Sequence, residues 1–116
     1  MAKAKSKLAL KPWGWYAVIE TLPTYWIKEI FVRKGEKLSL QSHKNRSEVW
    51  VVLKGTIRAQ KGKKFYTLRE GDSVKINKKE KHRMMGVADS LVLEAAFGKP
   101  EEKDIIRYED KYGRVK

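Results

Sequence analysis

The sequence contains no cysteine and only two histidines, and it is short of proline and of acidic residues. Without cysteine the chain forms no disulfide and offers no thiolate, so a metal site would have to use nitrogen and oxygen ligands. No apolar run approaches the roughly 20 residues of a membrane-spanning helix. The basic N-terminus lacks the apolar core of a secretory signal, so we expect a cytoplasmic protein without a membrane segment.

Basic residues outnumber acidic residues by 27 to 14, which gives the chain a formal charge of +13. Such a surplus favours anionic ligands, for example sugar phosphates, nucleotides or nucleic acid. The lysines are spread along the chain and form no helical basic stripe. We therefore do not expect nucleic acid as a partner.

Short β-rich runs separated by glycine turns recur along the chain, and no segment demands a long helix. This pattern predicts an all-β barrel or sandwich. The expected strands cover residues 15–20, 26–33, 47–53, 56–60, 64–68, 72–76, 81–86 and 91–96, with one more beginning at Lys37 and a short one at 105–108. A length of 116 residues fits one domain, which we expect at 11–116 with a C-terminal tail, preceded by a flexible or swapped arm at 1–10.

Two stretches, residues 35–55 and 71–86, each contain one of the two histidines. Residues two apart on a strand point to the same face, so Gln41 and His43 face one way, and Glu48 returns on the next strand. One amide oxygen, two imidazoles and one carboxylate make a mixed site for a divalent metal: Gln41, His43, Glu48 and His82. Zinc is the first expectation, with manganese, cobalt, nickel and magnesium as alternatives.

This spacing resembles the two sequence motifs of the cupin superfamily. In the first motif two glycines enclose a His-x-His pair and a glutamate, and here Gln41 stands in place of the first histidine. In the second motif His82 is kept, while Asn77, Lys79 and Gly86 stand where proline, glycine and asparagine are usual. The resemblance implies a small double-stranded β-helix barrel.

Within the cupins the chain resembles the C-terminal domain of type II phosphomannose isomerases, which are often fused to a mannose-1-phosphate guanylyltransferase. The similar segments run along nearly the whole chain: KPWGWY at 11–16, GEKLSLQSH at 35–43, Arg46, EVW at 48–50, HR at 82–83 and DIIRYEDKYGR at 104–114. The family usually has histidine at the positions of Lys44, Asn45 and Val49. The resemblance implies a metal-dependent isomerase that interconverts mannose 6-phosphate and fructose 6-phosphate.

Two charged residues, Lys28 and Glu94, lie in strand patterns that are otherwise apolar. Buried charges are rare unless they are paired or functional, although an exposed strand edge would also explain them. Isomerisation moves a proton between two sugar carbons and needs a base. Glu48, Glu94 and Lys28 are the candidates, and Glu94 is preferred if Glu48 binds the metal.

Three arginines are candidates for holding the phosphate of the substrate. Arg46 and Arg83 lie next to proposed metal ligands, and a guanidinium suits bidentate phosphate binding, with surface ion pairs as the alternative. The family resemblance implies that the C-terminal tail folds over the barrel, which would bring Arg107 to the substrate.

Two other functions stay open. A non-catalytic cupin that binds a sugar or small anion is favoured by the loss of three family histidines. A different cupin enzyme, such as an oxygenase, is disfavoured because Gln41 suits a redox iron site poorly. An unpaired sheet edge invites pairing with a second chain, so we expect a homodimer formed through the N-terminal segment with Trp13 and Trp15.

Overall fold

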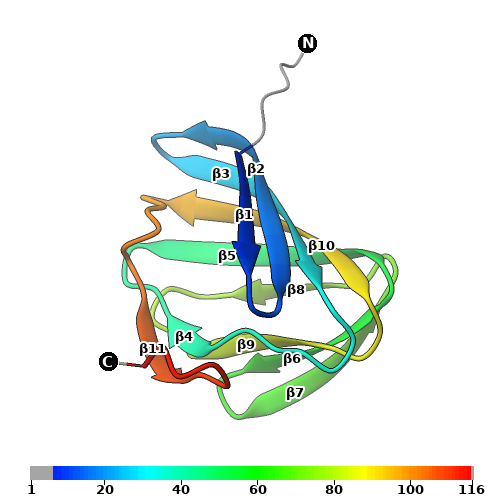
Figure 1. The fold of residues 1–116 in the computed structure, drawn as a ribbon. Helices are drawn as coiled ribbons and strands as arrows, with labels where there is room; N and C mark the ends of the chain where they lie inside the picture. Colours follow the sequence, from blue (N-terminus) through cyan, green and yellow to red (C-terminus); the bar gives the residue numbers. More distant parts are fainter. Residues whose placement is uncertain (1–6, 116) are drawn as a thin grey trace.

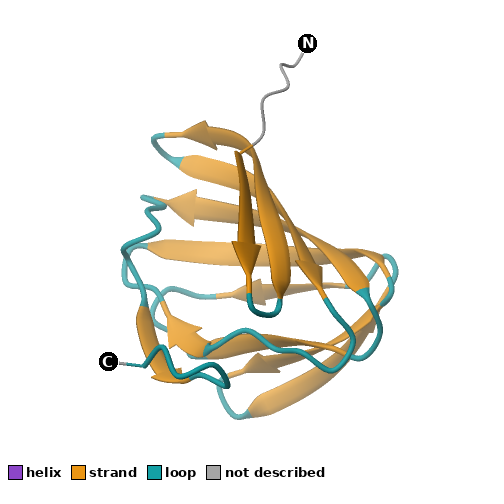
Figure 2. Cartoon of the chain, viewed as in Figure 1, coloured by secondary structure: helices purple, strands orange, loops and turns teal. Residues whose placement is uncertain are grey.

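The computed structural model describes residues 7–115, and every regular element in that part of the chain is a β-strand (Figure 1). Figure 2 shows these strands joined only by turns and loops, which confirms the all-β prediction. The strands are β1 (Lys7–Lys11), β2 (Gly14–Leu22), β3 (Tyr25–Val32), β4 (Leu40–Ser42), β5 (Arg46–Lys54), β6 (Thr56–Lys61), β7 (Lys64–Arg69), β8 (Ser73–Ile76), β9 (His82–Gly86), β10 (Ser90–Gly98) and β11 (Ile106–Glu109).

The strands form two antiparallel sheets that enclose one core. The six-stranded sheet has the order β1-β2-β3-β10-β5-β8, and the five-stranded sheet has the order β11-β4-β9-β6-β7. Successive strands repeatedly cross from one sheet to the other, as the double-stranded β-helix prediction requires. The sheets are not joined by hydrogen bonds into one closed barrel, so the cavity opens between them.

The predicted strands are present with small differences at their ends, and one strand begins later than predicted. The segment expected to start a strand at Lys37 forms only a single bridge with Met85, and β4 begins at Leu40. The reason is that Gly35 and Leu38 donate separate hydrogen bonds to Gly86 and Met84, at the end of β9, without a continuous ladder.

Along β3, β10 and β5, three neighbouring strands of the larger sheet, the interior changes from an apolar end to a polar end. On β3, every second residue from Trp26 to Val32 is buried, which confirms the face predicted from the alternation. The inward residues of each strand change from apolar to charged along its length. Val32 and Ile30 give way to Lys28 on β3, Val52 and Trp50 to Glu48 on β5, and Val92 to Glu94 on β10. Because these strands are paired in register, their charged residues meet at one end of the core.

Strand β1 lies against β2 of the same chain, with Leu10 opposite Trp15. Residues 7–10 of the predicted N-terminal arm therefore belong to the larger sheet, while residues 1–6 lie outside the described residues. Trp13 packs in the core at 4% exposure, so of the two tryptophans in this segment only Trp15 is partly exposed. No helix in the described part of the chain is long and apolar enough to cross a membrane.

Candidate metal centre and cavity

Three predicted metal ligands meet at the polar end of the core. His43 follows β4, Glu48 lies in β5 and His82 begins β9, and all three side chains are buried. The Nε2 atoms of His43 and His82 are 3.1 Å apart. Glu48 Oε2 is 3.3 Å from His43 Nε2, and Glu48 Oε1 is 3.7 Å from His82 Nε2. The chain thus brings together a histidine–glutamate–histidine cluster that could bind a metal.

The hydrogen bonds of both imidazoles point their free nitrogens at the same place. His43 Nδ1 lies 2.7 Å from the carbonyl of Asp104, and His82 Nδ1 lies 2.8 Å from the carbonyl of Glu80. A carbonyl only accepts, so each Nδ1 carries the proton and each Nε2 keeps a lone pair. With neutral rings, a divalent cation between the two Nε2 atoms, which lie 3.1 Å apart, could be bound by both.

The spacing of these donor atoms fits a coordinated divalent ion. A tetrahedral ion with bonds of about 2.1 Å has ligand atoms about 3.4 Å apart. The three separations here run from 3.1 to 3.7 Å. The residues present therefore fit a zinc-like ion without large rearrangement.

Gln41 lies beside this cluster, on β4 directly opposite His82. Its amide nitrogen donates to Ser39 Oγ at 2.8 Å and to the Ser39 carbonyl at 3.3 Å. These bonds leave the amide oxygen as the ligand that the side chain can offer. Gln41 also lines the same cavity as Glu48 and His82.

The turn before His82 keeps its shape although two usual residues of the motif are replaced. Lys79, at the position of the usual glycine, adopts a positive φ of 67°. This left-handed conformation is unfavourable for a lysine by about 1–2 kcal/mol. The turn is held by the Lys79 amide, which donates to the His43 carbonyl at 2.7 Å, so it links the two metal-binding stretches directly.

Arg46 neutralises the cluster from one side. Its Nε donates to Glu48 Oε2 at 2.9 Å, and its Nη2 lies 3.1 Å from His43 Nε2. Burial opposes the ionisation of Glu48, but the nearby His82, His43 and Arg46 outweigh it and hold the pKa of Glu48 below its ordinary value. Burial also lowers the pKa of His43 to about 4, with Arg46 adding to the effect and Glu48 opposing it. A neutral imidazole and an ionised carboxylate are the forms that bind metals.

Glu94 and Lys28, the two predicted catalytic residues, face each other across β10 and β3 in the same cavity. Trp26 Nε1 donates to Glu94 Oε2 at 2.9 Å. Burial, together with the charge of Glu48, raises the pKa of Glu94 to about 7, although Lys28 and Arg46 oppose the shift. A carboxyl with such a pKa can take up and release a proton near neutral pH.

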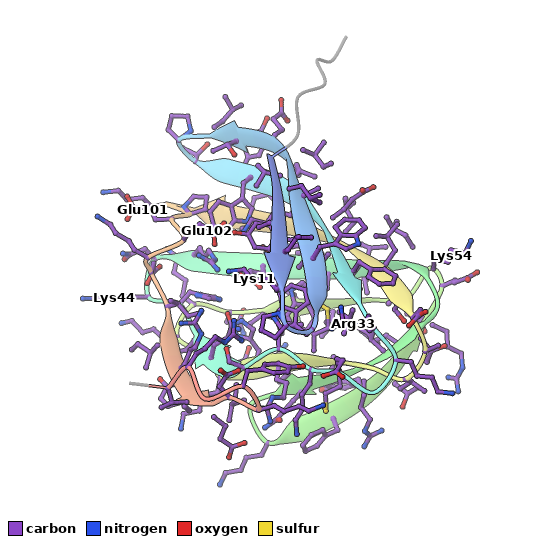
Figure 3. All side chains as sticks on the ribbon, viewed as in Figure 1. Lys11, Arg33, Lys44, Lys54, Glu101 and Glu102 are labelled. Atoms are coloured by element: carbon purple, nitrogen blue, oxygen red, sulfur yellow. The ribbon has the colours of Figure 1, made fainter. Side chains whose placement is uncertain are left out.

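Lys28 is only 4% exposed and is fully provided with partners. Its ammonium lies 3.9 Å from the centroid of the Trp26 ring and 4.2 Å from that of Tyr16. It also donates to Glu102 at 2.5 Å. Glu102 lies in the segment that follows β10, where Figure 3 labels it beside Glu101.

The other two predicted substrate-binding arginines differ in their surroundings. Arg83 donates to the Leu38 carbonyl at 2.9 Å and to Glu109 at 3.2 Å. Arg107 lies on β11 opposite Gln41, and its buried Nε finds no hydrogen-bond partner among the described residues. Both side chains line the cavity with Arg46, Arg83 from β9 and Arg107 from β11.

Sequence reasoning missed four residues that line this cavity or contact its charged groups: Lys11, Tyr16, Trp26 and Glu102. The alternation of β3 placed Trp26 on the inner face, but it could not show that Trp26 lies beside Glu94 and Lys28. Glu102 carries no signal of its own, because it belongs to a charged connecting segment.

Comparisons with known proteins agree with this architecture. The family described as mannose-6-phosphate isomerase C-terminal matches residues 2–110. The mannose-1-phosphate guanylyltransferase ManC of Salmonella typhimurium is 38% identical over 108 residues, which cover 90% of this chain and 22% of that protein. The alginate biosynthesis protein AlgA of Pseudomonas aeruginosa is 36% identical over 108 residues, again 90% of this chain and 22% of the relative. The chain thus spans about a fifth of the length of these curated relatives.

Solved structures of low sequence identity share the fold. KdgF from Halomonas sp. has a TM-score of 0.78 at 14% identity, covering 86% of this chain and 91% of that one. An RmlC-like cupin from Shewanella frigidimarina has a TM-score of 0.73 at 16% identity, covering 85% and 88%. Sequence and structure together show that the chain is a cupin and belongs to the family of mannose-6-phosphate isomerase C-terminal domains.

Proposed function

We propose that the chain is a metal-dependent isomerase that interconverts mannose 6-phosphate and fructose 6-phosphate. The observation that supports this best is a pair of buried carboxyls in one cavity whose pKa values are shifted in opposite directions. Glu48 is kept ionised beside two imidazoles, whereas the pKa of Glu94 is raised to about 7. One carboxylate suits metal binding, and the other suits proton transfer.

Gln41, His43, Glu48 and His82 would hold the divalent ion, with zinc as the first candidate and manganese, cobalt, nickel or magnesium as alternatives. When bound, the ion would polarise the substrate carbonyl and stabilise the enediolate charge. Glu94 takes the proton from one sugar carbon and returns it to the neighbouring carbon. Lys28, directly opposite Glu94, supplies positive charge beside the reacting atoms.

The three missing family histidines do not weaken the proposal. Lys44 and Asn45 are exposed, and Val49 alternates with the buried Arg46, Glu48 and Trp50, which places it on the outer face of β5. A histidine at any of these positions would not point into the cluster. Their replacement therefore leaves the cluster intact and does not favour a binding module over the isomerase.

The deciding experiment is a coupled assay for fructose 6-phosphate, with mannose 6-phosphate as substrate and one divalent metal at a time. We expect turnover that a chelator abolishes and that the metal restores. The His43→Ala/His82→Ala double variant should contain no bound metal and show no turnover. If the metal-loaded protein binds mannose 6-phosphate but does not convert it, the isomerase proposal fails and a non-catalytic sugar-binding cupin replaces it.

We also propose that the protein is a cytoplasmic homodimer. Leu8 and Leu10 on β1 are 62% and 78% exposed. They belong to the outer face of the larger sheet, where Trp15 stacks on Phe31 with 5.6 Å between ring centroids. Light scattering at micromolar concentration should give twice the chain mass, and Leu10→Glu should give a monomer. A monomeric wild type would refute the dimer.

A further inference from the structure

The cavity contains more positive charge than its own carboxylates pair with. Six cationic side chains line it: Lys11, Lys28, Arg46, Arg83, Arg107 and Arg114. Four of them have a carboxylate partner, in the pairs Lys28–Glu102 at 2.5 Å, Arg46–Glu48 at 2.9 Å, Arg83–Glu109 at 3.2 Å and Arg114–Asp110 at 2.7 Å. Lys11 and Arg107 have no ion pair within residues 7–115.

The remaining carboxyl of the cavity does not partner either of them. Glu94 accepts a hydrogen bond from Trp26 at 2.9 Å and lies opposite Lys28 in the sheet. The two unpaired cations are therefore available to a ligand.

Of the two residues, Arg107 gives the stronger indication of a ligand. Its Nε is buried and finds no hydrogen-bond partner in the described part of the chain. A guanidinium is always charged, and a buried donor left without an acceptor is unfavourable. The pairing of β11 with β4 puts Arg107 opposite Gln41, and Gln41 lies opposite His82. Arg107 is thus two strands away from a residue of the metal centre, on the same sheet.

Lys11 approaches the same cavity from the other sheet. It is the last residue of β1, where Figure 3 labels it, and it lies opposite Gly14. Its ammonium lies 5.8 Å from the centroid of the Tyr16 ring, close to the outer limit of about 6 Å for a cation–π contact. The ammonium keeps its donors for an anion.

We infer that Lys11 and Arg107 form an anion site selective for the dianion of a phosphate monoester. Two unpaired positive charges match two negative charges, and a planar guanidinium with an ammonium gives donors to several phosphate oxygens. A monoanionic ester leaves one of these two half-buried cations uncompensated, and a neutral sugar leaves both. This inference rests on the proposed function only for the sugar that carries the phosphate.

Calorimetric titration of the full chain with three ligands tests the site. The ligands are mannose 6-phosphate, mannose 6-sulfate and mannose, at pH 8, where the phosphate ester is a dianion because its second pKa is about 6. The sulfate ester has the same shape but one negative charge. We expect the wild type to bind the phosphate ester at least about 10-fold more tightly than the sulfate ester, as a charge-assisted hydrogen bond predicts.

Variants of the two residues identify the site. Arg107→Gln and Lys11→Gln should each remove most of the preference for phosphate over sulfate. Arg107→Lys keeps the charge, so it should bind the phosphate ester more tightly than Arg107→Gln does. Arg58→Gln is the control, because Arg58 is exposed on β6 and its loss removes the same net charge away from the cavity.

Three results would overturn the inference: no preference for phosphate in the wild type, an unchanged preference in Arg107→Gln with a folded variant, or an equal loss in Arg58→Gln. Turnover is measured separately. If the protein turns over mannose 6-phosphate but does not prefer phosphate over sulfate, the anion site is rejected and the isomerase proposal stands. If it prefers phosphate but shows no turnover, the isomerase proposal is rejected and the anion site stands.

Discussion

Glu48 and Glu94 are two buried carboxyls in one cavity, but their surroundings give them opposite properties. Glu48, at 2% exposure, contacts Arg46 at 2.9 Å and has His43 and His82 within 3.7 Å. Glu94, at 6% exposure, has the indole of Trp26 as its hydrogen-bond donor. Positive neighbours outweigh burial at the first site, whereas burial prevails at the second. One residue type thus supplies both a permanent anion and a group that exchanges protons.

The difference arises from strand register. Glu94 on β10 lies opposite Lys28 on β3 and opposite Trp50 on β5, whereas Glu48 lies opposite Ala96. Lys28 is held by Glu102, which reduces its ability to pair with Glu94. Lys28 still lowers the pKa of Glu94, but burial and the charge of Glu48 outweigh it.

The largest effect is expected when Glu48 loses its charge. Glu48→Gln removes the only carboxylate of the histidine cluster described here, so metal content should fall from about one ion per chain to background. Turnover should fall by at least about 100-fold with it. Metal analysis after dialysis and the coupled assay measure the two quantities.

Glu102→Gln is the matched control for this change, because Glu102 lines the same cavity but pairs with Lys28 outside the cluster. It should keep its metal. Glu48→Gln also leaves Arg46 without its carboxylate partner, so thermal unfolding must first show that the variant is folded. Glu48→Asp serves as a second variant, which keeps the negative charge. Full metal content in folded Glu48→Gln would contradict the assigned ligand set.

The next effect concerns Glu94 as the base. Glu94→Gln should lower kcat by about 100- to 10,000-fold, which is the usual contribution of a general base, and leave metal content unchanged. Glutamine keeps an oxygen that can accept from Trp26, so the packing is preserved.

The pH dependence gives an independent test of the same residue. A base works in its ionised form, and the pKa of Glu94 is about 7, so kcat/KM of the wild type should rise with pH and level off above 7. The residual activity of Glu94→Gln should lack this step. A step that persists in the variant would assign the titration to another group.

A smaller effect is expected for His43, on the free energy of unfolding measured in the presence of a chelator. Its pKa is about 4 in the folded chain and 6.5 in the unfolded chain, so the unfolded state binds more protons between these values. The contribution of neutral His43 to the free energy of unfolding is therefore complete above pH 6.5 and is lost as the pH falls to 4. A shift of this size corresponds to on the order of 3 kcal/mol. Urea unfolding at pH 7.5 and 4.5 should show the loss, and His43→Gln should reduce it; an equal loss in the variant would contradict this origin.

Local patterns in the sequence account for the strands and for much of the site. Alternation along residues 26–33 placed Lys28 inside, and motif spacing predicted that His43, Glu48 and His82 lie together. The strand expected at Lys37 was wrong at its start, because its hydrogen bonds go singly to the end of β9.

Partners that lie far apart in sequence could not be predicted. The contacts of Lys28 with Glu102 and of Trp26 with Glu94 span 74 and 68 residues. Neither pattern nor spacing fixes such a pair, because the first depends on the path of the segment after β10 and the second on the pairing of β3 with β10. The raised pKa of Glu94 arises from its burial and from the charge of Glu48, and neither could be predicted from sequence patterns.

The smallest expected effect is at the positions where the family usually has histidine. Asn45 is exposed, and its backbone amide donates to Asp104 at 2.8 Å, so its side chain is not part of the cluster. Asn45→His should therefore leave metal content and turnover within about twofold of the wild type, since surface changes away from special features have small effects. The same holds for Val49→His, on the outer face of β5. A clear gain of metal affinity in either variant would mean that these positions lie close to the histidine–glutamate–histidine cluster. The proposed division of roles, with Glu48 binding the metal and Glu94 exchanging protons, would then have to include a third residue.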